Sequence, residues 1–202
     1  MKNILKLLAL FALTTSCKAQ NQIIDIQNDN GDEITGAYYK DIQNILDPFI
    51  GTYIYTDGTT SLKIVLQKKL MSSHSNLRYY EDLIVGEYQY IKDGVEIANT
   101  LNRLNINKPD GSNYSICGNN IITKTSGICP DCTPNEKALF LGFVDDLTDN
   151  LTDSFIVRRV VEDGQPAIKI MILWAISGHL KGTPSSQKPN IPGGYYILIK
   201  QP

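Results

Sequence analysis

The chain has 202 residues, of which 42% are hydrophobic, with 19 basic and 21 acidic side chains and a formal net charge of −2. A chain of this length can form one domain with a core that needs no disulfides for stability. The charge balance leaves no basic patch, which argues against nucleic acid as a partner.

The first twenty residues have the pattern of a lipoprotein signal peptide. Lys2 and Lys6 supply a positively charged start, and the uncharged apolar stretch that follows, over residues 7–13, is too short to span a bilayer. Small residues then lead directly to Cys17. We therefore predict a signal peptide over residues 1–16 and a lipid anchor on Cys17, which would hold the exported protein on a membrane of the bacterial cell envelope, with the outer membrane expected. An ordinary secretory signal cut after Ala19 is the alternative.

A polar segment follows the predicted anchor. Residues 17–36 are rich in Asn, Gln and Asp, which indicates a tether, and residues 37–202 are predicted to form a single β-rich domain. Apolar side chains then recur at helical spacing, which predicts a short helix over residues 38–46 that Pro48 limits at its C-terminal end.

From Gly51 onward the hydrophobic period changes to two, which is typical of strands with one buried face. Asp-Gly pairs at residues 57–58, 93–94 and 163–164 separate alternating segments and predict tight hairpins. A strand is also expected over residues 137–144. The pattern predicts an all-β domain: an antiparallel meander of about eight to nine strands, folded as a barrel or a sandwich.

Three segments resemble a domain-of-unknown-function family of small exported bacterial lipoproteins. They are Leu46 to Tyr53, Tyr79 to Leu101, and Gly193 to Gln201. The resemblance implies export and a β-rich fold, but no activity. A looser resemblance is to lipocalin-like barrels, which open with a short helix and a strand beginning Gly-x-Trp. In this chain the strand begins Gly51-Thr52-Tyr53, with tyrosine in place of the tryptophan. Such a barrel could enclose one small apolar ligand.

The cysteines give the sharpest local motif. Cys129 and Cys132 form a C-x-x-C pair, which in an exported protein favours a disulfide. A redox dithiol is an alternative, although no helix is expected after the pair to activate it. Zinc is another, but the two histidines lack ligand spacing to the cysteines. Cys117 is left over or pairs with one of the other two. We predict no metal site and no cofactor.

Two further clusters have alternative interpretations. Tyr53, Tyr88, Tyr90 and Trp174 lie on predicted strands and either line a ligand cavity or pack as core. Asp145, Asp146, Asp149 and Asp153 could attract calcium, but they lack the regular ligand spacing of a calcium loop, so a solvated loop is the preferred interpretation.

No catalytic constellation and no phosphate-binding loop were found. We therefore predict a non-catalytic, lipid-anchored envelope protein that binds a small apolar ligand or another envelope protein. One alternative is a protein inhibitor of the immunity type, for which the acidic charge would suit a basic partner. A remote alternative is a thiol redox protein that uses Cys129 and Cys132.

Overall fold

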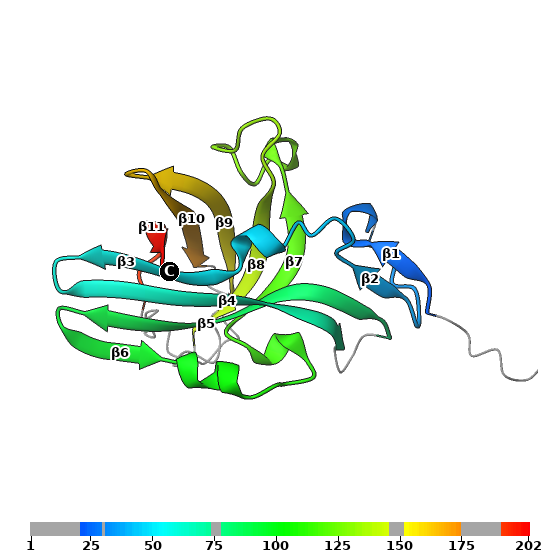
Figure 1. The fold of residues 1–202 in the computed structure, drawn as a ribbon, viewed down its shortest axis with the longest axis horizontal. Helices are drawn as coiled ribbons and strands as arrows, with labels where there is room; N and C mark the ends of the chain where they lie inside the picture. The colour runs from blue at the N-terminus through cyan, green and yellow to red at the C-terminus, as the bar shows by residue number, and fades with distance from the viewer. Residues whose placement is uncertain (1–20, 30, 74–77, 146–151, 175–190) are drawn as a thin grey trace, which may run out of the picture.

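A computed structural model describes residues 21–29, 31–73, 78–145, 152–174 and 191–202 (Figure 1). Regular structure in these residues is β-strand, apart from 3-10 helices of three to five residues. The predicted all-β class is therefore confirmed. In the described part of the chain, no helix has the length and hydropathy needed to cross a membrane.

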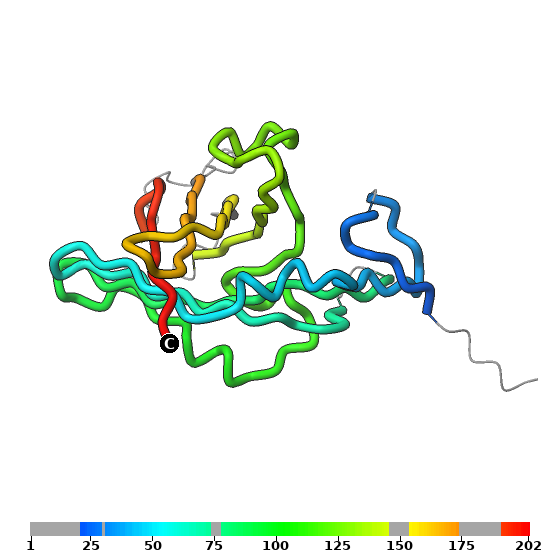
Figure 2. The backbone as a smooth tube through the Cα atoms, turned by 45° about the horizontal axis from the view of Figure 1, so that its top comes forward, coloured from blue at the N-terminus to red at the C-terminus, as the bar shows by residue number. Residues whose placement is uncertain are grey.

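Strands that follow one another along the chain form a closed antiparallel ring. Its members are β3 (Gly51–Asp57), β4 (Thr60–Ser73), β5 (Tyr80–Lys92), β7 (Ile116–Ile122), β8 (Ala138–Val144), β9 (Thr152–Glu162), β10 (Gln165–Trp174) and β11 (Gly194–Lys200). Figures 1 and 2 show β7 to β11 as a curved wall standing on the layer formed by β3, β4 and β5. The meander is thus confirmed, with more strands in total than expected.

The ring is not a regular barrel, because two of its joints are short. β11 meets β3 through only two residue pairs, Ile199 with Ile54 and Lys200 with Tyr53. β5 meets β7 through three pairs, over residues 84–86 and 116–118. The remainder of that edge of β5 pairs with β6 (Val95–Asn99) and, at its start, with β2 (Tyr38–Lys40).

The predicted hairpins form where the Asp-Gly pairs lie. Asp93 and Gly94 join β5 to β6 with φ values of 51° and 79°, and Asp163 and Gly164 join β9 to β10 with 49° and 76°. Positive φ at both positions gives the turn whose twist matches that of the flanking strands. The third pair is offset by one residue, since Asp57 is the last residue of β3 and Gly58 begins the two-residue turn to β4.

The prediction of a helix over residues 38–46 is wrong. Residues 38–40 form β2, which pairs in parallel with both β1 (Ile23–Asp25) and β5. The Asp41 carboxylate then accepts the backbone N–H groups of Ile45 at 2.8 Å and Leu46 at 3.0 Å, which replaces the carbonyl acceptors of a helix. A single 3-10 turn, η2 (Asp47–Phe49), leads into β3.

The folded part begins before residue 37. β1 lies within the segment predicted as a tether, and Ile26 directly after it is buried. The predicted tether is therefore too long, because apolar residues in this otherwise polar segment extend the sheet beyond β2.

Candidate functional site

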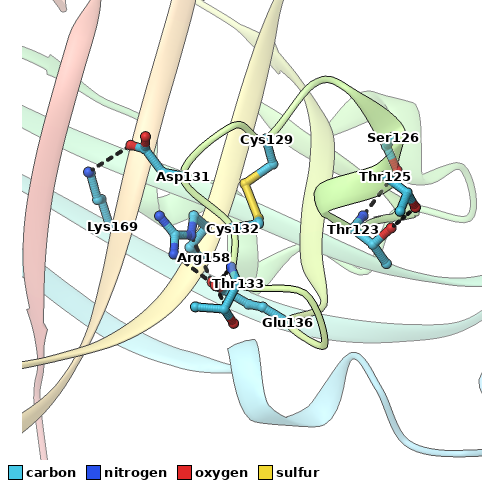
Figure 3. Close-up of a disulfide and its surroundings, with 10 residues drawn as sticks. All are labelled: Thr123, Thr125, Ser126, Cys129, Asp131, Cys132, Thr133, Glu136, Arg158 and Lys169. Atoms are coloured by element: carbon cyan, nitrogen blue, oxygen red, sulfur yellow. Dashed lines mark hydrogen bonds and ion pairs between the residues drawn. A yellow bond between two sulfur atoms is a disulfide. The ribbon is translucent and has the colours of Figure 1, made fainter.

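The connection between β7 and β8 is stapled by a disulfide between Cys129 and Cys132, as predicted (Figure 3). Both cysteines are buried in a small cluster with Ile122, Ala138 and Ile156. Ile156 alternates with the core residues of β9, so the loop packs on the outer face of the ring. The disulfide therefore holds an external loop rather than lining the interior.

Two ion pairs fasten the same loop to the strands beneath it (Figure 3). The Arg158 guanidinium donates to both carboxylate oxygens of Glu136, at 2.7 and 2.8 Å. This hydrogen bonding holds the pKa of Glu136 below its usual range. Asp131 meets Lys169 of β10 at 3.3 Å. The space between loop and sheet amounts to about 20 Å³, enough for one water and not for an organic ligand.

Cys117 lies on β7, outside the disulfide, and is the free cysteine of the described residues. Burial, together with the charges of Glu81 and Asp110, raises the pKa of its thiol to about 11. Such a thiol is a poor nucleophile and a poor metal ligand at neutral pH. No cluster of three or more His, Cys, Asp or Glu side chains suited to a metal occurs in the described ranges, and both histidines lie outside them.

The aromatic residues considered as cavity walls lie mostly within the packed core. Tyr88 and Tyr90 are buried, and the Tyr88 ring stacks edge-on against Phe143 with centroids 5.2 Å apart. Tyr53 is also buried, but it lies at one end of the ring and lines a surface hollow. The backbone of Trp174 ends β10, and its side chain is outside the described part.

One member of the acidic cluster differs from the expectation. Asp145 is fully buried, and its carboxylate accepts a hydrogen bond from the Tyr88 hydroxyl at 2.9 Å. The solvated-loop interpretation is therefore wrong for Asp145. Asp146 and Asp149 lie outside the described residues, as does the side chain of Asp153.

A hollow of about 450 Å³ opens at the end of the ring where β3 begins and β9 and β11 finish. Its walls include the positive side chains of Arg159 and Lys200 and the rings of Tyr53 and Pro48. Its remaining lining residues are Val160, Val161, Pro166 and Ala167. We call this feature the cationic hollow. Its size falls within the range of small-ligand sites.

Strand alternation places both cations on the inner face of the ring. Phe155 and Val157 of β9 belong to the core, and Arg159 follows at the next position of the same parity. Leu198 of β11 is likewise in the core, and Lys200 is two residues further on. Two charged side chains therefore occupy positions that elsewhere in these strands are apolar.

Gly51 makes room for one of these cations. Its φ is +148°, and a Cβ at this position would lie 2.7 Å from Cε of Lys200. The lysine stem can therefore lie close against β3, with its ammonium 5.8 Å from the centroid of the Tyr53 ring. This close approach explains the glycine of the Gly-x-Tyr motif.

Each of the two cations of the hollow lies over an aromatic ring. The Arg159 guanidinium carbon lies 5.7 Å from the centroid of the Phe49 ring, which η2 inserts into this end of the core. Burial raises the pKa of Tyr53, and the positive charge of Arg159 partly opposes that rise. Among the residues that the structure describes, neither Arg159 nor Lys200 forms an ion pair with a carboxylate.

The sequence reasoning missed Arg159 and Lys200. The available signal was the alternation itself, since each charged residue continues an apolar series that ends at a strand terminus. The alternation does not show that the ends of β9 and β11 lie at the same hollow as η2.

Comparisons with known proteins give one match. No curated protein and no solved structure matches the chain. A family profile described as a family of unknown function, DUF6705, matches residues 1–201. Because that match covers nearly the whole sequence, the chain belongs to the DUF6705 family.

Proposed function

We propose that this chain is a lipid-anchored envelope protein that binds, without catalysis, a small ligand carrying an anionic group on an apolar body. The observation that carries the proposal is the cationic hollow. Two inward-facing cations line it, and neither has a carboxylate partner among the described residues. The anchor rests on the signal-peptide pattern ending at Cys17.

The chemistry of the walls defines the ligand class. A carboxylate or phosphate would neutralise Arg159 and Lys200 and accept their hydrogen bonds, which the aromatic rings beneath them cannot do. Apolar side chains of the hollow, such as Val160 and Ala167, would contact the body of the ligand. An anionic amphiphile therefore fits better than a neutral apolar molecule.

Calorimetric titration of the lipidated chain in nanodiscs tests this assignment. Hexanoate is expected to bind, whereas hexanol, with the same chain length and no charge, is expected to bind far more weakly. Arg159→Gln and Lys200→Gln should each weaken hexanoate binding about tenfold, which corresponds to one charge-assisted hydrogen bond.

The matched control is Lys92→Gln, which removes an exposed cation at the opposite end of the ring. If this variant weakens binding as much as the two hollow variants, the effect reflects overall charge and the site assignment fails. Equal binding of hexanol would exclude an anion site.

A protein-binding surface beside the disulfide loop is the second candidate. Ile128 of the loop and Tyr195 of β11 are exposed and line the same narrow space. Exposed apolar side chains that lie together often mark protein contacts. A photo-crosslinking residue at position 195 should capture one discrete envelope protein in intact cells, whereas the same residue at position 95 should not. Equal capture from both positions would reject this surface.

A further inference from the structure

β4 contains an irregularity that exposes two adjacent apolar side chains. The register with β5 shifts between Lys69 and Ser72, so Leu70 and Met71 form a bulge. Leu70 is 63% exposed and Met71 is 49% exposed. Met71 has a φ of 47°, a backbone conformation that residues other than glycine seldom adopt. The backbone is therefore strained at the point where it presents apolar groups to the outside.

A buried carboxylate fixes this bulge. Asp82 accepts the backbone N–H of Met71 at 3.1 Å and the Tyr38 hydroxyl at 2.5 Å through one oxygen. Its other oxygen accepts the N–H of Asp41 at 3.1 Å. Three donors from β4, β2 and the following turn thus converge on one side chain. The exposure of Leu70 and Met71 is accordingly built into the fold and does not result from fraying.

Further exposed apolar residues lie at the same end of the sheet. Ile23 of β1 is in register with Tyr38, which is in register with Tyr80, so these residues project from one face of the sheet. Ile42 follows the Asp41 that Asp82 binds. We define the Leu70 patch as Ile23, Ile42, Leu70, Met71 and Tyr80, all of which are exposed. β1 and β2 mark this end of the molecule in Figure 1.

We infer that the Leu70 patch rests on the surface of the bilayer that carries the anchor. The inference depends on the proposed lipid anchor at Cys17. Only five residues lie between Cys17 and Ile23, and the six extended Cα–Cα steps reach at most about 20 Å. The patch residue Ile23 must therefore lie close to the lipid headgroups, and the other exposed side chains of the patch can enter the membrane–water interface.

Charges around the patch favour apolar contact over attraction to charged lipids. Lys40 and Arg78 are exposed near it, but so are Asp32 and Glu33. Because both signs are present, the contact should form on neutral bilayers and persist in high salt.

Fluorescence quenching on vesicles tests the inference with the lipidated full-length chain. Leu70→Trp is compared with Val95→Trp, which places a tryptophan at an equally exposed apolar position at the start of β6, beside the far end of β5. The vesicles are neutral phosphatidylcholine with brominated acyl chains, and the signal of the native Trp174 is subtracted using the unmodified chain. Leu70→Trp should lose a substantial share of its emission, and Val95→Trp should lose little.

Equal quenching of the two variants would overturn the inference. A blue shift of Leu70→Trp without quenching would also overturn it, because it would mean that another protein or a second copy covers the patch. Labelled palmitate distinguishes failure of the anchor from failure of the patch. If the chain takes up no labelled palmitate, the proposed anchor and the inference both fail. If the chain is labelled but Leu70→Trp is not selectively quenched, the inference alone fails.

Discussion

At the scale of single residues, the structure is defined by polar groups that the core encloses. Asp41, Asp82 and Asp145 are buried, and each accepts hydrogen bonds from named donors. A buried carboxylate is stable only when its partners replace water. The carboxylate oxygens of Asp41 and Asp82 accept backbone N–H groups where β2 ends and where β4 bulges. These two residues therefore shape the backbone around them.

Asp82→Ala should therefore destabilise the protein more than an average surface change. The substitution leaves the N–H groups of Met71 and Asp41 and the Tyr38 hydroxyl without their acceptor, which should cost about 2–4 kcal/mol. Urea denaturation followed by circular dichroism measures the loss. Asp57→Ala removes an exposed carboxylate at the end of β3 and should change stability by less than about 0.5 kcal/mol. Similar losses for the two variants would mean that Asp82 does not organise the bulge.

The free thiol leads to a second prediction at this scale. A pKa of about 11, against an ordinary 9.0, leaves about a hundredfold less thiolate on Cys117 at pH 8 than on an unperturbed cysteine. Alkylation by iodoacetamide should be correspondingly slow in the native state and fast in urea, as followed by mass spectrometry. Native alkylation at the unfolded rate would show that Cys117 is accessible and ionised.

At the scale of elements, the disulfide loop depends on both covalent and ionic contacts. Cys129 and Cys132 close only a short segment, so the staple alone fixes little of the connection between β7 and β8. The bidentate contact of Arg158 with Glu136 ties the later part of that connection to β9. The ion pair should therefore contribute to holding the loop on the sheet.

The contact between Arg158 and Glu136 makes the free energy of unfolding depend on pH. Because the folded pKa of Glu136 is lowered, its contribution is complete above the ordinary glutamate pKa and is lost as pH falls through the lower folded value. Arg158→Gln should cost about 1 kcal/mol at pH 7, and the difference from the unmodified chain should shrink in acid. Urea titrations at several pH values measure this difference. A difference independent of pH would show that Arg158 acts through packing alone.

Local signals in the sequence predicted the elements better than they predicted the joints. The Asp-Gly turns and the alternation that begins at Gly51 identified hairpins correctly, because both signals depend on neighbouring residues. The helical spacing over residues 38–46 misled, because the Asp41 side chain competes for the N–H groups that a helix needs. The cationic hollow was missed because Phe49 and Tyr53 reach Arg159 and Lys200 only through the joint between β11 and β3.

At the scale of the whole molecule, the strand register separates the two proposed features along the sheet. Lys200, which lines the cationic hollow, pairs with Tyr53 of β3, and Tyr53 pairs with Ile64 of β4. Leu70 lies six residues further along β4, roughly 20 Å away at the rise of a strand. The cationic hollow and the Leu70 patch are therefore separate sites, and an anchor beside the patch does not by itself bring the hollow to the bilayer.

Closure of the ring depends on a glycine in β5. Gly86 pairs with Leu66 of β4 on one side and with Ile116 of β7 on the other, at one of the two short joints. A Cβ at this position would lie 2.7 Å from Cδ2 of Leu66 and 2.9 Å from the backbone oxygen of Val65. The leucine can move, but the carbonyl cannot move without displacing β4. The absence of a side chain therefore lets three strands meet at this point.

Gly86→Ala should accordingly cost about 1–3 kcal/mol through overpacking, although alanine normally suits a strand better than glycine does. Gly142→Ala in β8 is the matched control, because its Cβ would meet the backbone oxygen of Cys117 at an ordinary 3.5 Å. That variant should be neutral or slightly stabilising. Urea unfolding of both variants compares the two sites. If Gly86→Ala proved as stable as Gly142→Ala, the β5–β7 joint would have to be looser than the structure shows, and ring closure would not depend on close approach at Gly86.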